Sequence, residues 1–181
     1  ILPAIYPEWL GERSFCNVHQ TRFAYVAGEM ANGIATTALV INMAKAGMLG
    51  FFGAAGLKPE RVEAAIEELE DTLGERWSWG MNLIHSPAEA ALEERVADLL
   101  IVRQVSRVSA SAFMELTPPI VRYAVTGLRT TPDGRLLRNH HVFAKVSRPE
   151  VARRFLSPAP ADILQVLLER GQITQSEAEL A

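Results

Sequence analysis

Residues 24–56 read AYVAGEMANGIATTALVINMAKAGMLGFFGAAG, and this stretch decides the fold. Two short apolar runs, 22–28 and 48–56, end in glycine and flank a segment whose apolar residues have helical spacing. We expect a helix over 36–47, because Thr36 or Thr37 can cap its start and Gly47 can end it. A strand, a helix and a second strand in this order predict a βαβ unit of a parallel sheet.

The same alternation continues along the chain. Further strands are expected at 77–86, 107–113 and 140–147, and further helices at 58–74, 88–104 and 117–128. Residues 1–22 read as an irregular lead-in, and 148–181 as a helical insertion or excursion. About five βα units in one domain indicate a parallel α/β protein, either an open doubly wound sheet or a (β/α)8 barrel. Both architectures bind ligands at the carboxyl ends of their strands.

Composition narrows the class of protein. A chain of 181 residues with 49% hydrophobic residues can bury a core, and its net charge of -3 argues against a general nucleic-acid binder. The one cysteine, Cys16, cannot form an internal disulfide, which favours a cytoplasmic protein, and no apolar run reaches the roughly 20 residues of a membrane span. The chain starts at Ile1 without methionine and stops inside a helix-like phrase, so we expect a longer parent protein.

Several long phrases carry a resemblance to a known family. They are YVAGEMANGIATTALVINMAKAGMLGFFGAAGL, NLIHSP, SASAFMELTPPIVRY and AKVSRPEVARRFLSPAP. The chain resembles the trans-acting flavin-dependent enoyl reductases of polyunsaturated fatty acid and polyketide synthases, which are similar to nitronate monooxygenases and bacterial flavin enoyl reductases. The resemblance implies the N-terminal part of an FMN-binding TIM barrel. It also implies NADPH or NADH as reductant, an enoyl thioester on an acyl carrier protein as substrate, and synthase subunits as partners.

The resemblance also implies cofactor-binding residues. Gly28, Glu29 and Met30 would line the isoalloxazine, Gly53 would lie beside it, and Asn82, at the end of the third strand, would hydrogen-bond its polar edge. Glu29 departs from the small residue expected there, so we expect it to point away or to contact the ring by its backbone alone. Without the resemblance, the two glycines read equally well as turn residues, and Asn82 as a strand-end cap.

Other candidates depend more on position than on motif. Lys145 follows the fifth strand and is either a partner in a salt bridge at the rim or a contact of flavin or substrate. His85 is a candidate catalytic residue, although an exposed loop histidine is the simpler interpretation. His140 and His141 are adjacent and point to opposite faces of a strand, so we expect no metal site there. The catalytic histidine and the phosphate-binding loops that the resemblance implies lie outside these 181 residues.

A whole barrel has eight βα units in about 250 residues. We therefore expect this chain by itself to lack activity, to bind FMN weakly, and to form a homo-oligomer or pair with a complementary chain. The segment 129–154 holds seven Lys or Arg against Asp133 and Glu150, which is either a docking face for an acidic carrier protein or ordinary solubilising charge. A nitronate monooxygenase and a non-catalytic interaction piece are the alternative functions.

Overall fold

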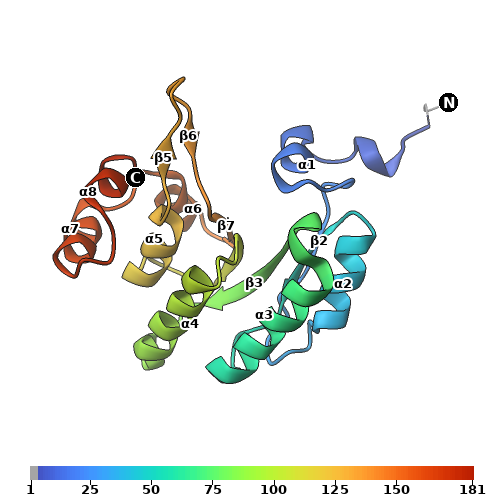
Figure 1. Cartoon of the computed structure of the whole chain (residues 1–181), viewed down its shortest axis with the longest axis horizontal. Coiled ribbons are helices and arrows are strands. Elements are labelled where there is room, and N and C mark those ends of the chain that lie inside the picture. Colours follow the sequence, from blue (N-terminus) through green and yellow to red (C-terminus); the bar gives the residue numbers. More distant parts are fainter. Residues whose placement is uncertain (1–3) are drawn as a thin grey trace. The chain divides into compact units, whose positions relative to one another are not determined.

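The computed structural model describes residues 4–181. It contains a five-stranded sheet of order β1-β2-β3-β4-β7 and a separate two-stranded hairpin, β5-β6 (Figure 1). The chain forms two compact units that divide in the sequence between Asn82 and Leu83. The expected parallel α/β architecture is confirmed.

The first unit has three strands and two long helices. The strands are β1 (Val26–Gly28), β2 (Leu49–Phe52) and β3 (Trp79–Ile84). The last two residues of β3 belong to the second unit. The helices are α2 (Thr37–Lys45) and α3 (Pro59–Leu73), and a 3-10 turn, η2 (Gly74–Arg76), follows α3. Thr36 caps α2 by accepting a hydrogen bond from the N–H of Leu39 at 3.1 Å. Helices α2 and α3 lie side by side (Figure 1) and bury apolar faces that were expected from the sequence.

The register of β2 shows which face of this unit meets the helices. A Cβ on Gly50 would lie 2.9 Å from the Cα of Val40 in α2, and the Arg61 guanidinium of α3 lies 5.7 Å from the ring centre of Phe52. These contacts place Gly50 and Phe52 on the helix side. Phe51, which pairs with Gly80 of β3, therefore faces away from the helices. Asn82 shares that inner face, because it lies two residues beyond Gly80 on the same strand.

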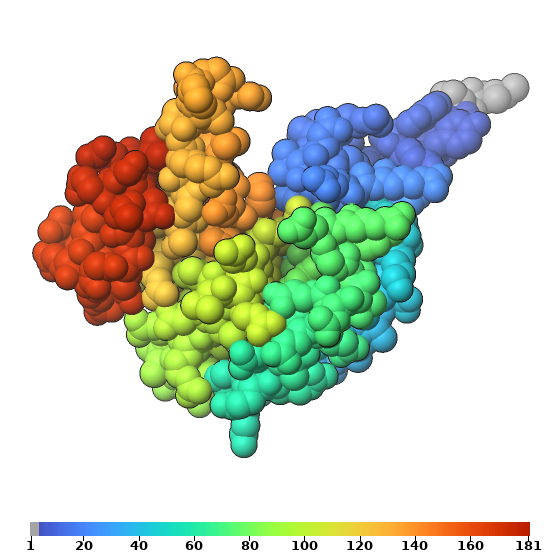
Figure 2. Space-filling view, in the orientation of Figure 1, coloured from blue at the N-terminus to red at the C-terminus, as the bar shows by residue number. Residues whose placement is uncertain are grey.

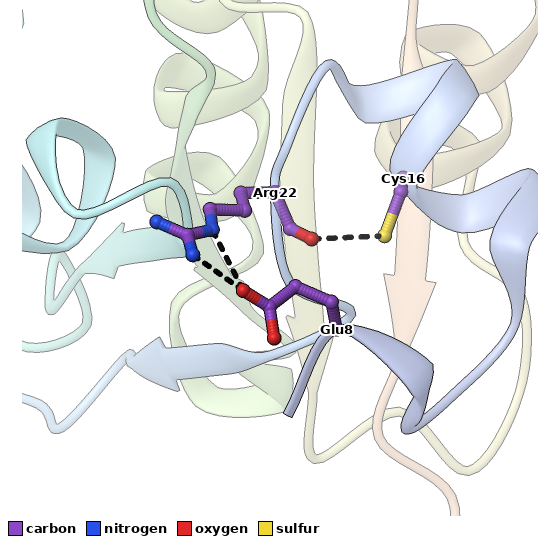
Figure 3. A network of polar contacts seen from close by, with 3 residues as sticks. All are labelled: Glu8, Cys16 and Arg22. Atoms are coloured by element: carbon purple, nitrogen blue, oxygen red, sulfur yellow. Dashed lines mark hydrogen bonds and ion pairs between the residues drawn. The ribbon is translucent and has the colours of Figure 1, made fainter. Parts of the chain in front are cut away.

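The segment before β1 is partly helical, which corrects the expectation of an irregular lead-in. It contains a 3-10 turn, η1 (Pro7–Trp9), and a short helix, α1 (Arg13–His19). Figure 3 shows Arg22 holding this segment: its Nε donates to the Glu8 carboxylate at 3.1 Å, and its terminal nitrogen forms an ion pair with the same oxygen. The Cys16 Sγ lies 3.9 Å from the Arg22 carbonyl oxygen. Polar contacts thus hold a segment whose large apolar side chains are mostly exposed, among them Ile5, Trp9 and Leu10.

The second unit pairs β4 (Arg107–Ser111) with β7 (His141–Ala144) in parallel. Its helices are η3 (Pro87–Glu89), α4 (Ala90–Val102), α5 (Pro118–Val125), α6 (Pro149–Leu156), α7 (Ala161–Glu169) and α8 (Gln175–Glu179). The last three confirm the helical character expected for 148–181. Tyr123 of α5 is completely buried, and its hydroxyl donates to the Val105 carbonyl oxygen at 2.6 Å.

A β-hairpin interrupts the strand-helix alternation of the second unit. Strands β5 (Arg129–Thr130) and β6 (Leu136–Leu137) pair antiparallel around the expected turn at 131–135. The hairpin, in orange in Figure 2, protrudes from the surface of its unit. Both strands are exposed and only two residues long, which explains why no apolar pattern marked them in the sequence. In the part of the chain that the structure describes, no helix is long and apolar enough to cross a membrane.

Candidate active site

The loop between β1 and α2 holds three of the predicted cofactor residues. Its backbone is unusual, because the non-glycine residues Glu29 and Asn32 both have φ of 56° and Gly28 has φ of 114°. The N–H of Glu29 donates to the carbonyl oxygen of Phe51 at 2.8 Å, so the loop is fixed to the end of β2. Met30 is 47% exposed and follows directly. Non-glycine residues in left-handed backbone are often found at ligand-binding loops.

The structure supplies a physical reason for Gly28 that the sequence did not reveal. A Cβ at this position would overlap the carbonyl oxygen of Phe51 and lie 2.9 Å from its nitrogen. Similarly, a Cβ on Gly53 would overlap the carbonyl oxygen of Met30. Both glycines are therefore required by protein backbone that approaches them closely, so their lack of a side chain is not evidence for a flavin.

Asn82 lies inside β3 and not at its end, which corrects the predicted position. The strand continues to Ile84 because Leu83 and Ile84 are apolar and keep the extended backbone. The Asn82 side chain is 2% exposed on the inner face of its unit. Asn82 is thus a buried amide on the face of β3 opposite the helices, two residues before the carboxyl end of the strand.

Lys145 lies where the sequence predicted, immediately after β7. Its N–H donates to the carbonyl oxygen of Ala110 at 2.9 Å and extends the pairing of β7 with β4 by one residue. Val142 and Ala144 of β7 lie on the side of α5. Because side chains alternate along a strand, Phe143 and Lys145 point to the opposite, inner face. Ser111 ends β4 beside it. Serine and lysine side chains thus follow the carboxyl ends of neighbouring strands in the second unit.

His85 is not the exposed loop histidine that the simpler interpretation proposed. Its Nδ1 lies 2.8 Å from Oε2 of Glu93, and its side chain is 23% exposed. The ring stacks on Phe113 with 5.3 Å between ring centres, and its backbone N–H donates to the Ser111 carbonyl oxygen at 3.0 Å. His85 therefore lies at the carboxyl end of β3, held by residues from α4 and from the loop after β4.

Glu93 is the centre of this network and was missed in the sequence. Its side chain, 3% exposed, accepts from the Ser86 N–H at 3.1 Å and from the Thr117 hydroxyl at 2.5 Å, in addition to contacting His85. Glu93 lies in the first turn of α4 and thereby joins this helix to the segment after β3 and to the start of α5. A glutamate eight residues after a strand-end histidine was the available signal, but spacing alone does not distinguish it from a surface residue.

The two adjacent histidines are structural elements of the second unit. His140 is 5% exposed, and its ring lies 4.5 Å from that of Tyr123. Burial, reinforced by the charges of Arg107, Arg138 and His140, lowers the pKa of His141 to about 4. Among residues 4–181, no three His, Cys, Asp or Glu side chains form a group that could hold a metal ion.

Each unit offers one polar side chain of a kind that can contact a flavin, Asn82 in the first and Lys145 in the second. An asparagine amide can donate to a ring carbonyl, and an ammonium can offset negative charge on the ring.

No family model matches the chain. The polyketide biosynthesis protein PksE of Bacillus subtilis is 44% identical over 176 residues, which are 97% of this chain and 23% of PksE. One of the polyunsaturated fatty acid synthase proteins of Thraustochytrium is 42% identical over 172 residues, which are 95% of this chain and 11% of that protein. The chain thus spans less than a quarter of the length of these curated relatives.

Solved structures extend the comparison to the fold. The enoyl reductase domain of MlnA, from the macrolactin biosynthesis cluster of Bacillus amyloliquefaciens, matches with a TM-score of 0.92 and 36% identity, over 96% of this chain and 39% of that one. The FabK M276A mutant of Thermotoga maritima matches with a TM-score of 0.62 and 21% identity, over 79% of this chain and 42% of that one, and supports the fold alone. The resemblance to the enoyl reductases of polyunsaturated fatty acid and polyketide synthases is thereby confirmed, and this chain has the fold of part of their TIM-barrel-like domain.

Proposed function

We propose that the protein carrying this chain is an FMN-dependent enoyl reductase that saturates enoyl thioesters on an acyl carrier protein, in trans with a polyunsaturated fatty acid or polyketide synthase. The observation that carries the proposal is the likeness of 96% of the chain to the MlnA enoyl reductase domain. The names of two relatives, one from polyketide biosynthesis and one from a polyunsaturated fatty acid synthase, support the synthase context. NADPH or NADH is the reductant and the cytoplasm the site of action.

A flavin, when bound, supplies hydride to the β-carbon of the enoyl thioester and is reduced again by NADPH or NADH. In this proposal the backbone of Gly28, Glu29 and Met30 lines the ring, and Gly53 supports that loop. Asn82 hydrogen-bonds the polar edge of the ring. Lys145 places a positive charge beside it, which favours the reduced, electron-rich cofactor. Residues outside this chain hold the phosphate.

The test uses the full-length protein. Its flavin is reduced anaerobically with NADPH or NADH and mixed in a stopped-flow instrument with a crotonyl thioester; in a second experiment the oxidised enzyme is mixed anaerobically with a nitroalkane. Rapid reoxidation of the reduced flavin by the thioester, and no reduction of the oxidised flavin by the nitroalkane, are expected. Rapid reduction of the oxidised flavin by the nitroalkane without a reaction of the thioester would favour a nitronate monooxygenase, and a purified protein without flavin would favour a non-catalytic interaction piece.

The carrier protein is proposed to dock on the basic hairpin of the second unit. Arg135, Arg148 and Arg154 form ion pairs with Asp133, Glu150 and Glu115, which supports ordinary surface charge for these three. Arg129 and Arg138 make no ion pair within the described residues, although Arg129 bonds the Asn139 side chain at 2.5 Å. The variant Arg129→Glu/Arg138→Glu should raise KM for a carrier-bound substrate and leave KM for a small crotonyl thioester unchanged. A KM for the carrier-bound substrate that is the same in the variant and in the wild type would contradict docking at the hairpin.

The 181-residue chain by itself should bind FMN weakly and reduce no enoyl thioester. Strands β1 and β7 lie at the edges of its sheet, and exposed edges favour pairing with a second copy or a complementary chain. Fluorescence titration with FMN and light scattering measure the two properties. A monomer that binds one FMN tightly would contradict this expectation.

A further inference from the structure

Arg129, the first residue of β5, is an exposed cation that two neutral groups hold in place. Its Nη1 donates to the side-chain oxygen of Asn139 at 2.5 Å and to the carbonyl oxygen of Gly127 at 3.1 Å. Neither acceptor is charged, so neither neutralises the guanidinium. Arg135 of the same hairpin differs, because it forms an ion pair with Asp133. Arg129 thus combines a fixed position with a charge that no carboxylate of its hairpin offsets.

The two bonds leave most of the Arg129 guanidinium open. Both of them use Nη1, and its Nε and Nη2 make no hydrogen bond to any residue in 4–181. The hairpin protrudes from its unit, so a partner can reach these donors (Figure 2). A guanidinium presents its donors in a planar fork that matches the two oxygens of a carboxylate. Because the side chain is already ordered, binding a carboxylate here costs less conformational entropy than binding one to a free arginine.

Gly127 fixes the two groups that hold Arg129. It has φ of 81°, and a Cβ at this position would overlap the amide nitrogen of Asn139, which therefore packs directly on the glycine. The Gly127 N–H donates to Oε1 of Glu177 at 2.6 Å, across fifty residues of sequence. A glycine that follows a helix ordinarily donates this N–H to a carbonyl of the last helical turn. The bond to Glu177 takes the place of such a local bond after α5.

Glu177 is itself held by the start of α8. Its Oε2 accepts from the N–H and the hydroxyl of Thr174, at 2.8 and 2.9 Å, and completes a capping box. The cap needs this oxygen alone, and Oε1 is the oxygen that bonds Gly127. Glu177 therefore joins the cap of α8 to the residue on which Asn139 and Arg129 are arranged.

We propose that Arg129 binds a carboxylate on the surface of the acyl carrier protein, and that Asn139 and Glu177 are the positioning residues of this contact. The inference rests on the proposed enoyl reductase function and names the group of the hairpin that recognises the carrier. The acidic surface of a carrier complements a cation that has no carboxylate of its own. Asn139 acts on the guanidinium directly, and Glu177 acts through Gly127.

The variants are Arg129→Ala, Asn139→Ala and Glu177→Met in the full-length enzyme, with Glu179→Met as the matched control. Glu179 lies on α8 as Glu177 does, but it is exposed and accepts a hydrogen bond from Gln175 of its own helix, at 3.0 Å. Flavin content and circular dichroism are measured first. The values of kcat and KM are then measured with three crotonyl thioesters, carried by the acyl carrier protein, by phosphopantetheine and by pantetheine.

Asn139→Ala and Glu177→Met should each raise KM for the carrier-bound substrate about 2- to 13-fold, because a freed arginine must be ordered again on binding. Arg129→Ala should raise this KM at least as much. The KM values for the two small thioesters, kcat, and every value of the Glu179→Met enzyme should be unchanged. Asn139→Ala added to Arg129→Ala should cause no further rise, because Asn139 acts through Arg129.

An Arg129→Ala enzyme with an unchanged KM for the carrier-bound substrate overturns the inference. So does an undiminished effect of Asn139→Ala in the Arg129→Ala background. A rise in KM for the phosphopantetheine thioester as large as that for the carrier would assign Arg129 to the phosphate of the arm, and would also overturn it. If Glu177→Met does not fold, the Arg129 and Asn139 variants, both at exposed positions, decide the test. A wild-type enzyme that reduces none of the three thioesters would instead contradict the proposed function.

Discussion

Replacement of Gly28 by alanine should destabilise the fold before it affects any ligand. The new Cβ overlaps the carbonyl oxygen of Phe51, so β1 must move away from β2. That movement weakens three registered residue pairs and the bond from the Glu29 N–H to the same carbonyl. At about 1 kcal/mol for each hydrogen bond, together with about 1 to 2 kcal/mol for an alanine at positive φ, the free energy of unfolding should fall by about 3 to 5 kcal/mol.

Gly171→Ala separates the two contributions. Gly171 also has positive φ, at 63°, but a Cβ there would have no heavy atom within 4 Å. Its substitution should therefore cost only the backbone term of about 1 to 2 kcal/mol. Urea unfolding followed by circular dichroism, with flavin content measured on the folded fraction, compares the two variants in the full-length protein.

A Gly28→Ala protein whose free energy of unfolding falls no more than that of Gly171→Ala would show that the clash with Phe51 carries no cost. A folded Gly28→Ala protein of normal stability that has lost its flavin would show that the space beside Gly28 belongs to the ligand. That outcome would restore the interpretation made from the sequence, in which the missing side chain makes room for the ring.

Three further results are expected. Asn82→Ala should raise the flavin dissociation constant by about 2- to 13-fold, since one hydrogen bond contributes about 0.5 to 1.5 kcal/mol, and should leave the circular dichroism spectrum unchanged. If the variant unfolds while its folded fraction keeps normal flavin chemistry, Asn82 has a structural role. Burial and nearby cations lower the pKa of His141 to about 4, so its contribution to the free energy of unfolding is complete above about pH 6.5 and is lost as the pH falls toward 4. His141→Gln should reduce this loss, measured as urea midpoints from about pH 7.5 to 4. A pH dependence unchanged by the substitution would contradict this prediction. Burial raises the pKa of Tyr123 well above its ordinary value, so the free energy of unfolding should fall as the pH rises above about 10. Tyr123→Phe should lessen that fall and should cost about 1 kcal/mol at pH 7, because it removes the hydrogen bond to Val105. Equal alkaline profiles of the variant and the wild type would show that another group titrates.

The order and type of the main elements could be predicted from the sequence because they depend on local patterns. The cap at Thr36, the helical spacing to Lys45 and the glycine at position 47 are read within a dozen residues, and the structure confirms α2 at this place. The five strands of the main sheet were likewise found from short apolar runs. Local patterns failed where little surface is buried, as in α1 and the exposed hairpin of β5 and β6.

The sequence by itself thus determined a parallel α/β fold, its strand order along the chain and the resemblance to enoyl reductases, since periodicity and long shared phrases are properties of the chain. Only the tertiary structure decided which neighbour each residue meets. It showed that Gly28 is required by the backbone of Phe51, and that Glu93 lies under His85. Both depend on segments brought together across a strand pair or between a loop and a helix, at distances that no sequence spacing specifies. A glutamate in a helical pattern reads as a solvated charge until folding buries it beside His85, Ser86 and Thr117.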